Sequence, residues 1–81
     1  MSIYRDTFGV MQGRIDGSNL RDTNGVWIGS IRGSKLYDTN GIYLGEFRHE
    51  GYFYDPNGVK QGQLRGNVYY DYYGNWMYIL E

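Results

Sequence analysis

Residues 22–29 read DTNGVWIG and residues 38–45 read DTNGIYLG, so the chain repeats nearly the same eight letters. The middle of this phrase is a turn sequence. The Asp22 carboxylate can accept hydrogen bonds from the backbone ahead of it, Asn24 tolerates unusual backbone angles, and Gly25 permits a positive φ. With glycine in the last place, the phrase predicts a type I turn closed by a G1 bulge. We interpret each DTNG as the turn of a β-hairpin.

The same turn recurs along all 81 residues. The aspartate that begins it reappears at intervals of 16, 16, 17 and 16 residues, which identifies an internal repeat. The chain is therefore predicted to be a single domain of five hairpin repeats, residues 1–16, 17–32, 33–48, 49–65 and 66–81, with one residue inserted near His49. The predicted structural turn residues are Asp6, Asp22, Asp38, Asp55 and Asp71, together with Gly9, Gly25, Gly41, Gly58 and Gly74.

Apolar residues also recur at fixed places in the repeat. One column comprises Tyr4, Leu20, Leu36, Phe53 and Tyr69, a second Val10, Val26, Ile42 and Val59, and a third Ile15, Ile31, Phe47, Leu64 and Leu80. The second and third columns are five residues apart, an odd number that changes face on a regular strand. Glycines lie between them (Gly13, Gly29, Gly45 and Gly62), and they indicate either a bulge that restores the phase or a close backbone contact.

The composition favours an all-β fold. The chain has 13 Gly and 10 Tyr but 1 Pro and no Ala, which suits short strands and sharp turns rather than helices. Ten short strands in a flat sheet would expose unpaired edges, and radial closure removes most of them. We expect five hairpins arranged radially about a pseudo-five-fold axis. A linear β-hairpin solenoid and a small closed barrel are the alternatives.

The phrase LYDTNGIYLGEFR (residues 36–48), repeated from end to end, resembles the small bacterial β-flower proteins. In that family, four or five β-hairpin repeats surround a central axis, and the resemblance implies the five-fold kind. It implies no established activity and no functional residues. YDTNG also resembles the YD repeat of polymorphic toxins, whose units are longer, and YYGNWMYI resembles choline-binding repeats, whose paired tryptophans do not recur here.

Charge and hydropathy exclude several classes of partner and location. Lys plus Arg total 8 and Asp plus Glu total 9, so a formal net charge of -1 predicts no nucleic-acid partner. No apolar run is long enough for a membrane span, which predicts no membrane partner. The first residues lack the apolar core of a secretory signal, so a cytoplasmic location is the default expectation, and a chain from which a signal has been trimmed is the alternative.

The inventory of catalytic and metal-binding groups is small. His49 is the only histidine and falls at the inserted residue, where an exposed loop position is expected, with Glu46 and Glu50 as surface acids beside it. One aspartate in each repeat does not supply the six to eight oxygens that calcium takes. The absence of cysteine excludes disulfides and thiolate metal sites. We predict neither an enzyme, nor a cofactor, nor a metal site.

Aromatic residues are the strongest functional signal. Tyr and Trp on a rigid sheet offer a large contact area at a small cost in conformational entropy, which suits sugars or protein partners. The predicted ligand-binding residues are Trp27, Tyr43, Tyr70, Tyr72 and Trp76. The sequence thus predicts a binding module for a glycan or protein. The alternative is a structural protein that forms a homo-oligomer through the same surface.

Overall fold

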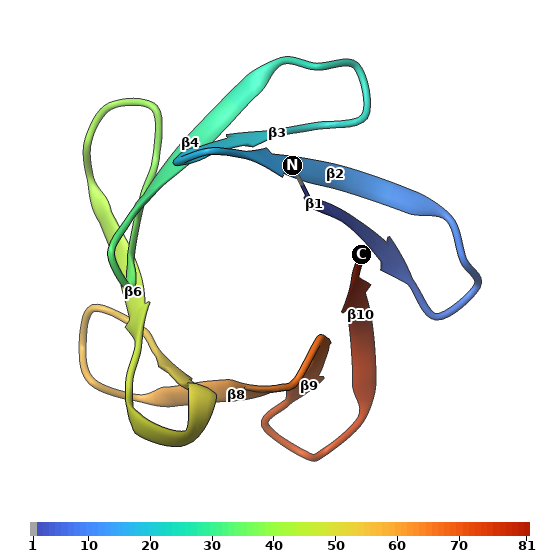
Figure 1. Ribbon diagram of the computed structural model, residues 1–81. Coiled ribbons are helices and arrows are strands. Elements are labelled where there is room, and N and C mark those ends of the chain that lie inside the picture. The colour runs from blue at the N-terminus through green and yellow to red at the C-terminus, as the bar shows by residue number, and fades with distance from the viewer. Residues whose placement is uncertain (1) are drawn as a thin grey trace.

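The computed structural model describes residues 2–81, which form ten antiparallel strands closed into a ring (Figure 1). The strands are β1 (Ser2–Asp6), β2 (Met11–Asp16), β3 (Asn19–Arg21), β4 (Trp27–Arg32), β5 (Lys35–Tyr37), β6 (Tyr43–Phe47), β7 (Tyr52–Tyr54), β8 (Lys60–Arg65), β9 (Val68–Asp71) and β10 (Trp76–Leu80). One short 3-10 helix, η1 (His49–Gly51), lies between β6 and β7.

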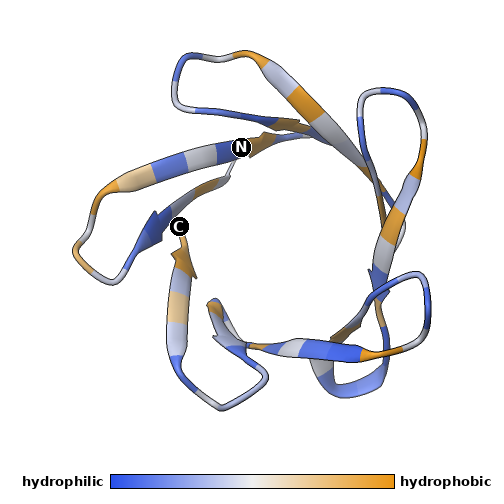
Figure 2. Cartoon of the chain, turned by 180° about the vertical axis from the view of Figure 1, so that it is seen from behind, coloured by the Kyte–Doolittle hydropathy of each residue, from blue (hydrophilic) through white to orange (hydrophobic). Residues whose placement is uncertain are grey.

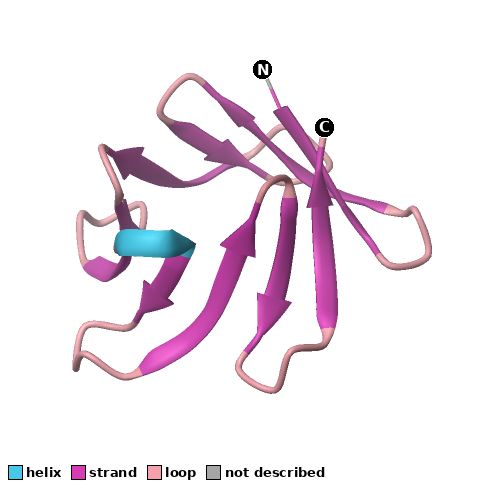
Figure 3. Ribbon diagram, turned by 60° about the horizontal axis from the view of Figure 1, so that its bottom comes forward, coloured by secondary structure: helices cyan, strands magenta, loops and turns pink. Residues whose placement is uncertain are grey.

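The ring closes because the first and last strands pair. β1 and β10 are antiparallel, and the Ile3 and Glu81 backbones exchange hydrogen bonds of 3.1 and 2.7 Å. The Arg5 and Glu81 side chains form an ion pair beside this seam. The result is a disc with extents of 31 × 30 × 15 Å, in which the start of β1 lies beside the end of β10 (Figure 3). The prediction of radial closure is confirmed, the alternative of a small closed barrel is consistent with the same strand order, and the linear solenoid is wrong.

The DTNG phrases form the predicted turns at the outer tips of the hairpins (Figure 1). The Gly25 N–H donates to the Asp22 carbonyl (3.1 Å), and the Asp22 N–H donates to the Val26 carbonyl (2.9 Å). Gly25 has φ +83°, so the turn is type I followed by a G1 bulge. Asp22 Oδ1 accepts the N–H groups of Asn24 and Val26, both at 2.9 Å. The aspartate therefore orders the turn through its side chain.

The hairpins are joined to one another by a second kind of turn. Two-residue loops begin with Gly17, Gly33 or Gly66, each at φ +63°, while the residue after each has a negative φ, as in a type II′ turn. The junction between the third and fourth hairpins, residues 48–52, differs because it contains the inserted residue. It forms η1 (Figure 3), and Glu50 there has φ +59°.

Both features that the sequence left open, a β-bulge and a close backbone contact, occur at the glycines between the apolar columns, but the bulge does not place the second column on the same face as the third. In the second hairpin Leu20 lies opposite Gly29 and Arg21 opposite Trp27, so Ile28 is the extra residue of a β-bulge. Gly29 itself is buried, and a Cβ there would lie 2.6 Å from the Tyr37 carbonyl oxygen of the next hairpin. The bulge and the close backbone contact therefore occur together.

The second apolar column remains outside the ring despite the bulge. Its members, which directly follow the turn glycine at the hairpin tip, are 54–59% exposed: Val10, Val26, Ile42 and Val59. Among residues 2–81, no hydrophobic side chain is fully buried, and the buried residues are Gly13, Gly29, Gly45 and Gly62. Figure 2 shows hydrophobic bands along the strands and further hydrophobic residues beside the mostly hydrophilic turns at the hairpin tips. Within the described chain, no helix is long and apolar enough to cross a membrane.

Candidate functional site

The centre of the ring is an open, apolar cavity of about 380 Å³, which we call the central pit. Six aliphatic and four aromatic side chains line it: Tyr4, Ile15, Leu20, Ile31, Leu36, Phe47, Leu64, Tyr69, Tyr78 and Leu80. These residues come from two of the apolar columns, with Tyr78 added. The inner faces of all five hairpins therefore contribute to one site.

The pit is open because the ring is too wide for these side chains to meet completely. The pairing of β5 with β4 and β6 places Leu36 opposite Ile31 on one side and Gly45 on the other. The buried glycines leave room above them for larger neighbours: the Tyr4 hydroxyl, for example, would lie 2.6 Å from a Cβ at Gly13. Even so, the lining residues remain half-buried. The apolar columns form the wall of a cavity as well as the core.

Tyr78 breaks the five-fold pattern because it takes the place of the glycine in the last hairpin. Its ring packs edge-on against Tyr4, with centroids 5.9 Å apart, and lies 6.5 Å from the ring of Tyr69. Burial raises the pKa of Tyr4, and nearby Tyr78 and Asp22 raise it further. Burial, Asp71 and Tyr78 raise the pKa of Tyr69. Both phenols are therefore neutral at pH 7, and this part of the wall carries no charge.

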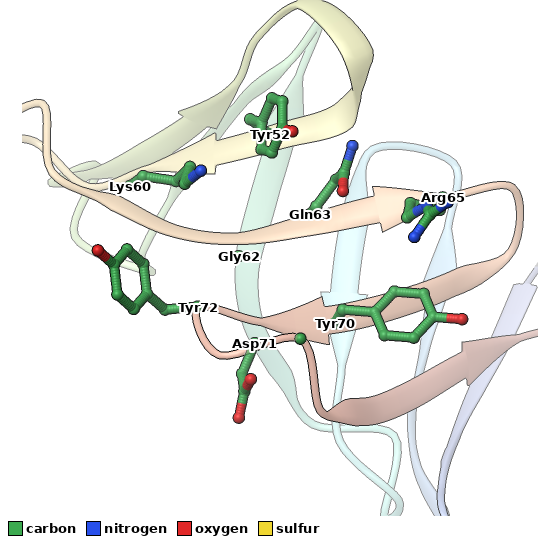
Figure 4. A pocket seen from close by; sticks show the side chains of 9 residues that line it. Tyr52, Lys60, Gly62, Gln63, Arg65, Tyr70, Asp71 and Tyr72 are labelled. Carbon is green, nitrogen blue, oxygen red and sulfur yellow. The ribbon is translucent and has the colours of Figure 1, made fainter.

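A second, smaller pocket of about 220 Å³ lies where the fourth and fifth hairpins meet (Figure 4). We call it the lysine groove, and its side chains are Tyr52, Lys60, Gln63, Arg65, Tyr70 and Tyr72. Gln63 pairs across the sheet with Tyr52 and with Tyr70, so these three share one face. The next residue, Leu64, lines the central pit. Because neighbours on a strand point to opposite faces, the groove opens on the outer side of the ring.

Asp71 also borders the lysine groove, but its carboxylate is held by its own turn. Oδ1 accepts the N–H groups of Tyr73 and Asn75 at 2.9 Å, and Oδ2 accepts the Asn75 amide at 3.2 Å. The Asn75 backbone N–H is the largest cause of the lowered pKa of Asp71, and the side-chain amide and two more backbone N–H groups add to it. Residues 2–81 contain no group of three or more His, Asp and Glu side chains placed to hold a metal ion.

A comparison with protein families finds that the family described as "4-fold beta flower protein" matches residues 2–70. The chain belongs to the β-flower family. No curated protein and no solved structure matches it. The β-flower family has no known function and is not a known enzyme family.

This β-flower has one hairpin more than the four-fold description. The matched segment ends inside β9, the first strand of the fifth hairpin, whereas β10 lies beyond it. Yet β10 closes the ring against β1, and it contributes Tyr78 and Leu80 to the central pit. The fifth hairpin thus closes the ring and completes the wall of the pit.

The five aromatic residues predicted as ligand-binding do not form one site in the β-flower. Tyr70 and Tyr72 both border the lysine groove, whereas Trp27 and Trp76 are not among its lining residues and are 44% and 48% exposed. The Tyr43 hydroxyl donates to Glu46 Oε1 (2.8 Å). Desolvation raises the pKa of Tyr43 most, and the bond to Glu46 adds to it. The predicted role of these residues in ligand binding stays a prediction.

His49 lies at the exposed junction of 48–52, with Glu50 also exposed, and its ring is 6.3 Å from that of Tyr52. It borders neither the central pit nor the lysine groove. The pit itself was missed by sequence reasoning, although the two inner columns were found. Their period was visible, but the distance of each column from the axis depends on how many hairpins close the ring.

Proposed function

We propose that this β-flower is a non-catalytic binding module that holds an apolar group of its ligand in the central pit. The observation that carries the proposal is the pit itself: a wall of ten apolar or aromatic side chains around about 380 Å³. Ligand pockets typically span about 300–1,000 Å³ and are predominantly apolar. An alkyl chain or an apolar side chain of a partner has the matching chemistry.

The energetics of the fold support this function. Since no hydrophobic side chain in residues 2–81 is fully buried, the inner columns are only half removed from water. A ligand that covers them completes their burial, and each buried methylene contributes about 0.8 kcal/mol. Binding therefore adds to a core that the small chain leaves incomplete.

The chemistry of the wall supports binding rather than catalysis. The titratable groups that line the pit are the phenols Tyr4, Tyr69 and Tyr78, with no carboxylate or imidazole among the lining residues. Phenols whose pKa is raised above the ordinary value of 10.0 are weak general acids at neutral pH. No acid–base pair meets at the proposed site.

The test is a titration with straight-chain alcohols from butanol to octanol, followed by tyrosine fluorescence and by NMR shifts of the leucine methyl groups. If the chain enters the pit, affinity should rise about fourfold per methylene, which corresponds to 0.8 kcal/mol, until the pit is full. Leu36→Asn places an amide in the wall and should abolish the trend. The control is Leu44→Asn in the same hairpin, because Leu44 is 43% exposed and lies outside the pit. Equal loss in both variants, or no dependence on chain length, would contradict the proposal.

Self-association is the second candidate, and the open mouth of the pit favours it. Two discs placed face to face would share their pseudo-five-fold axis and cover both pits, in an interface with the same patch on each copy. Sedimentation equilibrium would then show a dimer in the parent and in Leu44→Asn but a monomer in Leu36→Asn. A monomer in all three leaves ligand binding as the function of the pit.

A further inference from the structure

We propose that the lysine groove is a second binding site, separate from the central pit, and that it binds an acidic sugar: a pyranose ring that bears a carboxylate or sulfate group. The inference does not depend on the function proposed for the pit, because the two sites lie on opposite faces of β8. It follows from the charge of the groove, from its aromatic faces and from its departure from the repeat.

The groove presents two cations without a carboxylate partner. The ion pairs among residues 2–81 join Arg5 to Glu81 and Arg48 to Glu46, and they leave Lys60 and Arg65 free. The nearest acid in the lining is Asp71, whose oxygens are already occupied by its turn. Figure 4 shows this carboxylate directed away from Gln63 and Arg65. An anionic ligand would supply the missing partner.

The cations are held at the faces of tyrosine rings. Lys60 Nζ lies 4.5 Å from the ring centroid of Tyr52 and 6.0 Å from that of Tyr72, and Arg65 Cζ lies 5.7 Å from that of Tyr70. Figure 4 places Lys60 and Tyr72 at one end of the groove and Arg65 and Tyr70 at the other. This contact restrains the long side chains before any ligand arrives, which lowers the entropic cost of binding.

Gln63 lies between the two ends and adds a hydrogen-bonding group. Its Nε2 donates to the Glu50 carbonyl (2.9 Å), which fixes the amide and leaves Oε1 as an acceptor for a sugar hydroxyl. The groove thus combines cations, an acceptor and flat apolar faces. A volume of about 220 Å³ is below the range typical of drug-sized ligands and suits one sugar ring.

The groove also departs from the repeat in a way that the fold does not require. In the other hairpins the position of Lys60 is occupied by Met11, Trp27, Tyr43 and Trp76. The position of Tyr72 is Thr in the first three hairpins and Pro56 in the fourth. Since the same backbone tolerates these alternatives, the combination of Lys60 with Tyr52 and Tyr72 is local to one junction.

An acidic glycan fits better than a nucleic acid. The formal net charge of the chain is -1, so the chain has no excess of positive charge to attract a phosphate backbone, and the groove itself offers two cations, Lys60 and Arg65. The chemistry common to carboxylated and sulfated sugars is an anion on a ring with hydroxyl groups. The experiment therefore compares both kinds of anion with a neutral sugar and with an oligonucleotide.

The test is isothermal titration of the full chain with four probes: trigalacturonic acid, a heparin-derived tetrasaccharide, maltotriose and a thymidine octanucleotide. We expect one or both acidic sugars to bind, more weakly at higher salt, and maltotriose to bind at least about tenfold more weakly, as expected for a lost charged hydrogen bond. The comparison of the two acidic sugars shows whether the groove prefers a carboxylate or a sulfate group. Equal affinity for maltotriose, binding of the oligonucleotide alone, or no binding of either acidic sugar would overturn the proposal.

Two substitutions borrowed from other hairpins assign the binding to the groove. Lys60→Met copies Met11 and should weaken binding of the acidic sugar about tenfold. Tyr72→Thr copies the first three hairpins and should also weaken it, while circular dichroism verifies folding. Lys35→Met is the matched control, because Lys35 is the other lysine of the chain and lies outside the groove. An equal effect of Lys35→Met and Lys60→Met would refute the assignment. All three variants should still bind alcohols in the central pit. A failure of the proposal for the lysine groove can therefore be distinguished from a failure of the function proposed for the pit.

Discussion

Replacing Gly29 with alanine tests whether the close contact between hairpins holds the ring together. A Cβ at Gly29 would lie 2.6 Å from the Tyr37 carbonyl oxygen, a backbone atom that no rotamer change can move. Ordinary Cβ contacts begin at 3.4 Å, so β5 would have to move away from β4 by about 0.8 Å. That displacement is large beside the spacing of about 4.8 Å between paired strands, and it would lengthen their ladder hydrogen bonds.

The expected loss is about 2–3 kcal/mol, the upper part of the range for overpacked sites. For a domain of this size, each 1 kcal/mol lowers Tm by about 4–8 °C, so Tm should fall by about 10–20 °C. Thermal and urea unfolding followed by circular dichroism measure this loss. Hydrogen exchange should also accelerate in β4 and β5 first, since the hydrogen bonds between these strands are the ones that lengthen.

Gly41→Ala is the control for the generic effect of adding a methyl group. Gly41 has φ +81°, and a Cβ added there would have no neighbouring atom within 4 Å, so the cost is backbone strain of about 1 kcal/mol. The effect should remain local to the turn and leave exchange in β4 unchanged. If Gly29→Ala proved as stable as Gly41→Ala, the reasoning about the buried contact would be refuted.

Three further predictions concern the turns, the tyrosines and the closure of the ring. Asp38→Ala removes a carboxylate that accepts two backbone N–H groups and should cost about 1–2 kcal/mol in urea unfolding, whereas millimolar calcium should leave the Tm of the parent unchanged. Folding raises the pKa of Tyr4 and Tyr69 above 10.0, so their contribution to the free energy of unfolding should be complete below pH 10 and decline as pH rises above it. Replacing both with phenylalanine should flatten this decline. An unchanged dependence of stability on pH would contradict the role given to these two tyrosines. A circular permutant with joined termini, reopened between residues 33 and 34, should fold with a similar circular dichroism spectrum, and failure to fold would argue against equivalent hairpin junctions.

How much the sequence could predict depends on the range of the interactions. The turns were predictable because their bonds are local: Asp22 reaches backbone groups only two and four residues ahead, and Gly25 takes a backbone angle that its own lack of a side chain permits. The strands followed from the spacing of those turns and from the apolar columns. The bulge and the buried contact were both indicated by the glycine column, although only the tertiary structure shows that they coincide.

The sites depend on interactions between distant residues. Lys60 meets Tyr52 and Tyr72 because two hairpins pair across β8, and no period in the sequence places these three together. For that reason, sequence reasoning selected Tyr70 and Tyr72 but missed Lys60 and the groove. His49, which its type alone made a candidate, lies apart from both pockets.

By itself, the sequence determined the hairpin, since each DTNG turn is stabilised by groups within five residues of one another. Only the tertiary structure decided the rest: the pairing of β1 with β10 closes the chain, and five hairpins set the radius of the ring. That radius holds the inner side chains too far apart to bury one another fully. The central pit is thus a property of closure, because its volume depends on the number of hairpins around the axis and not on any single repeat.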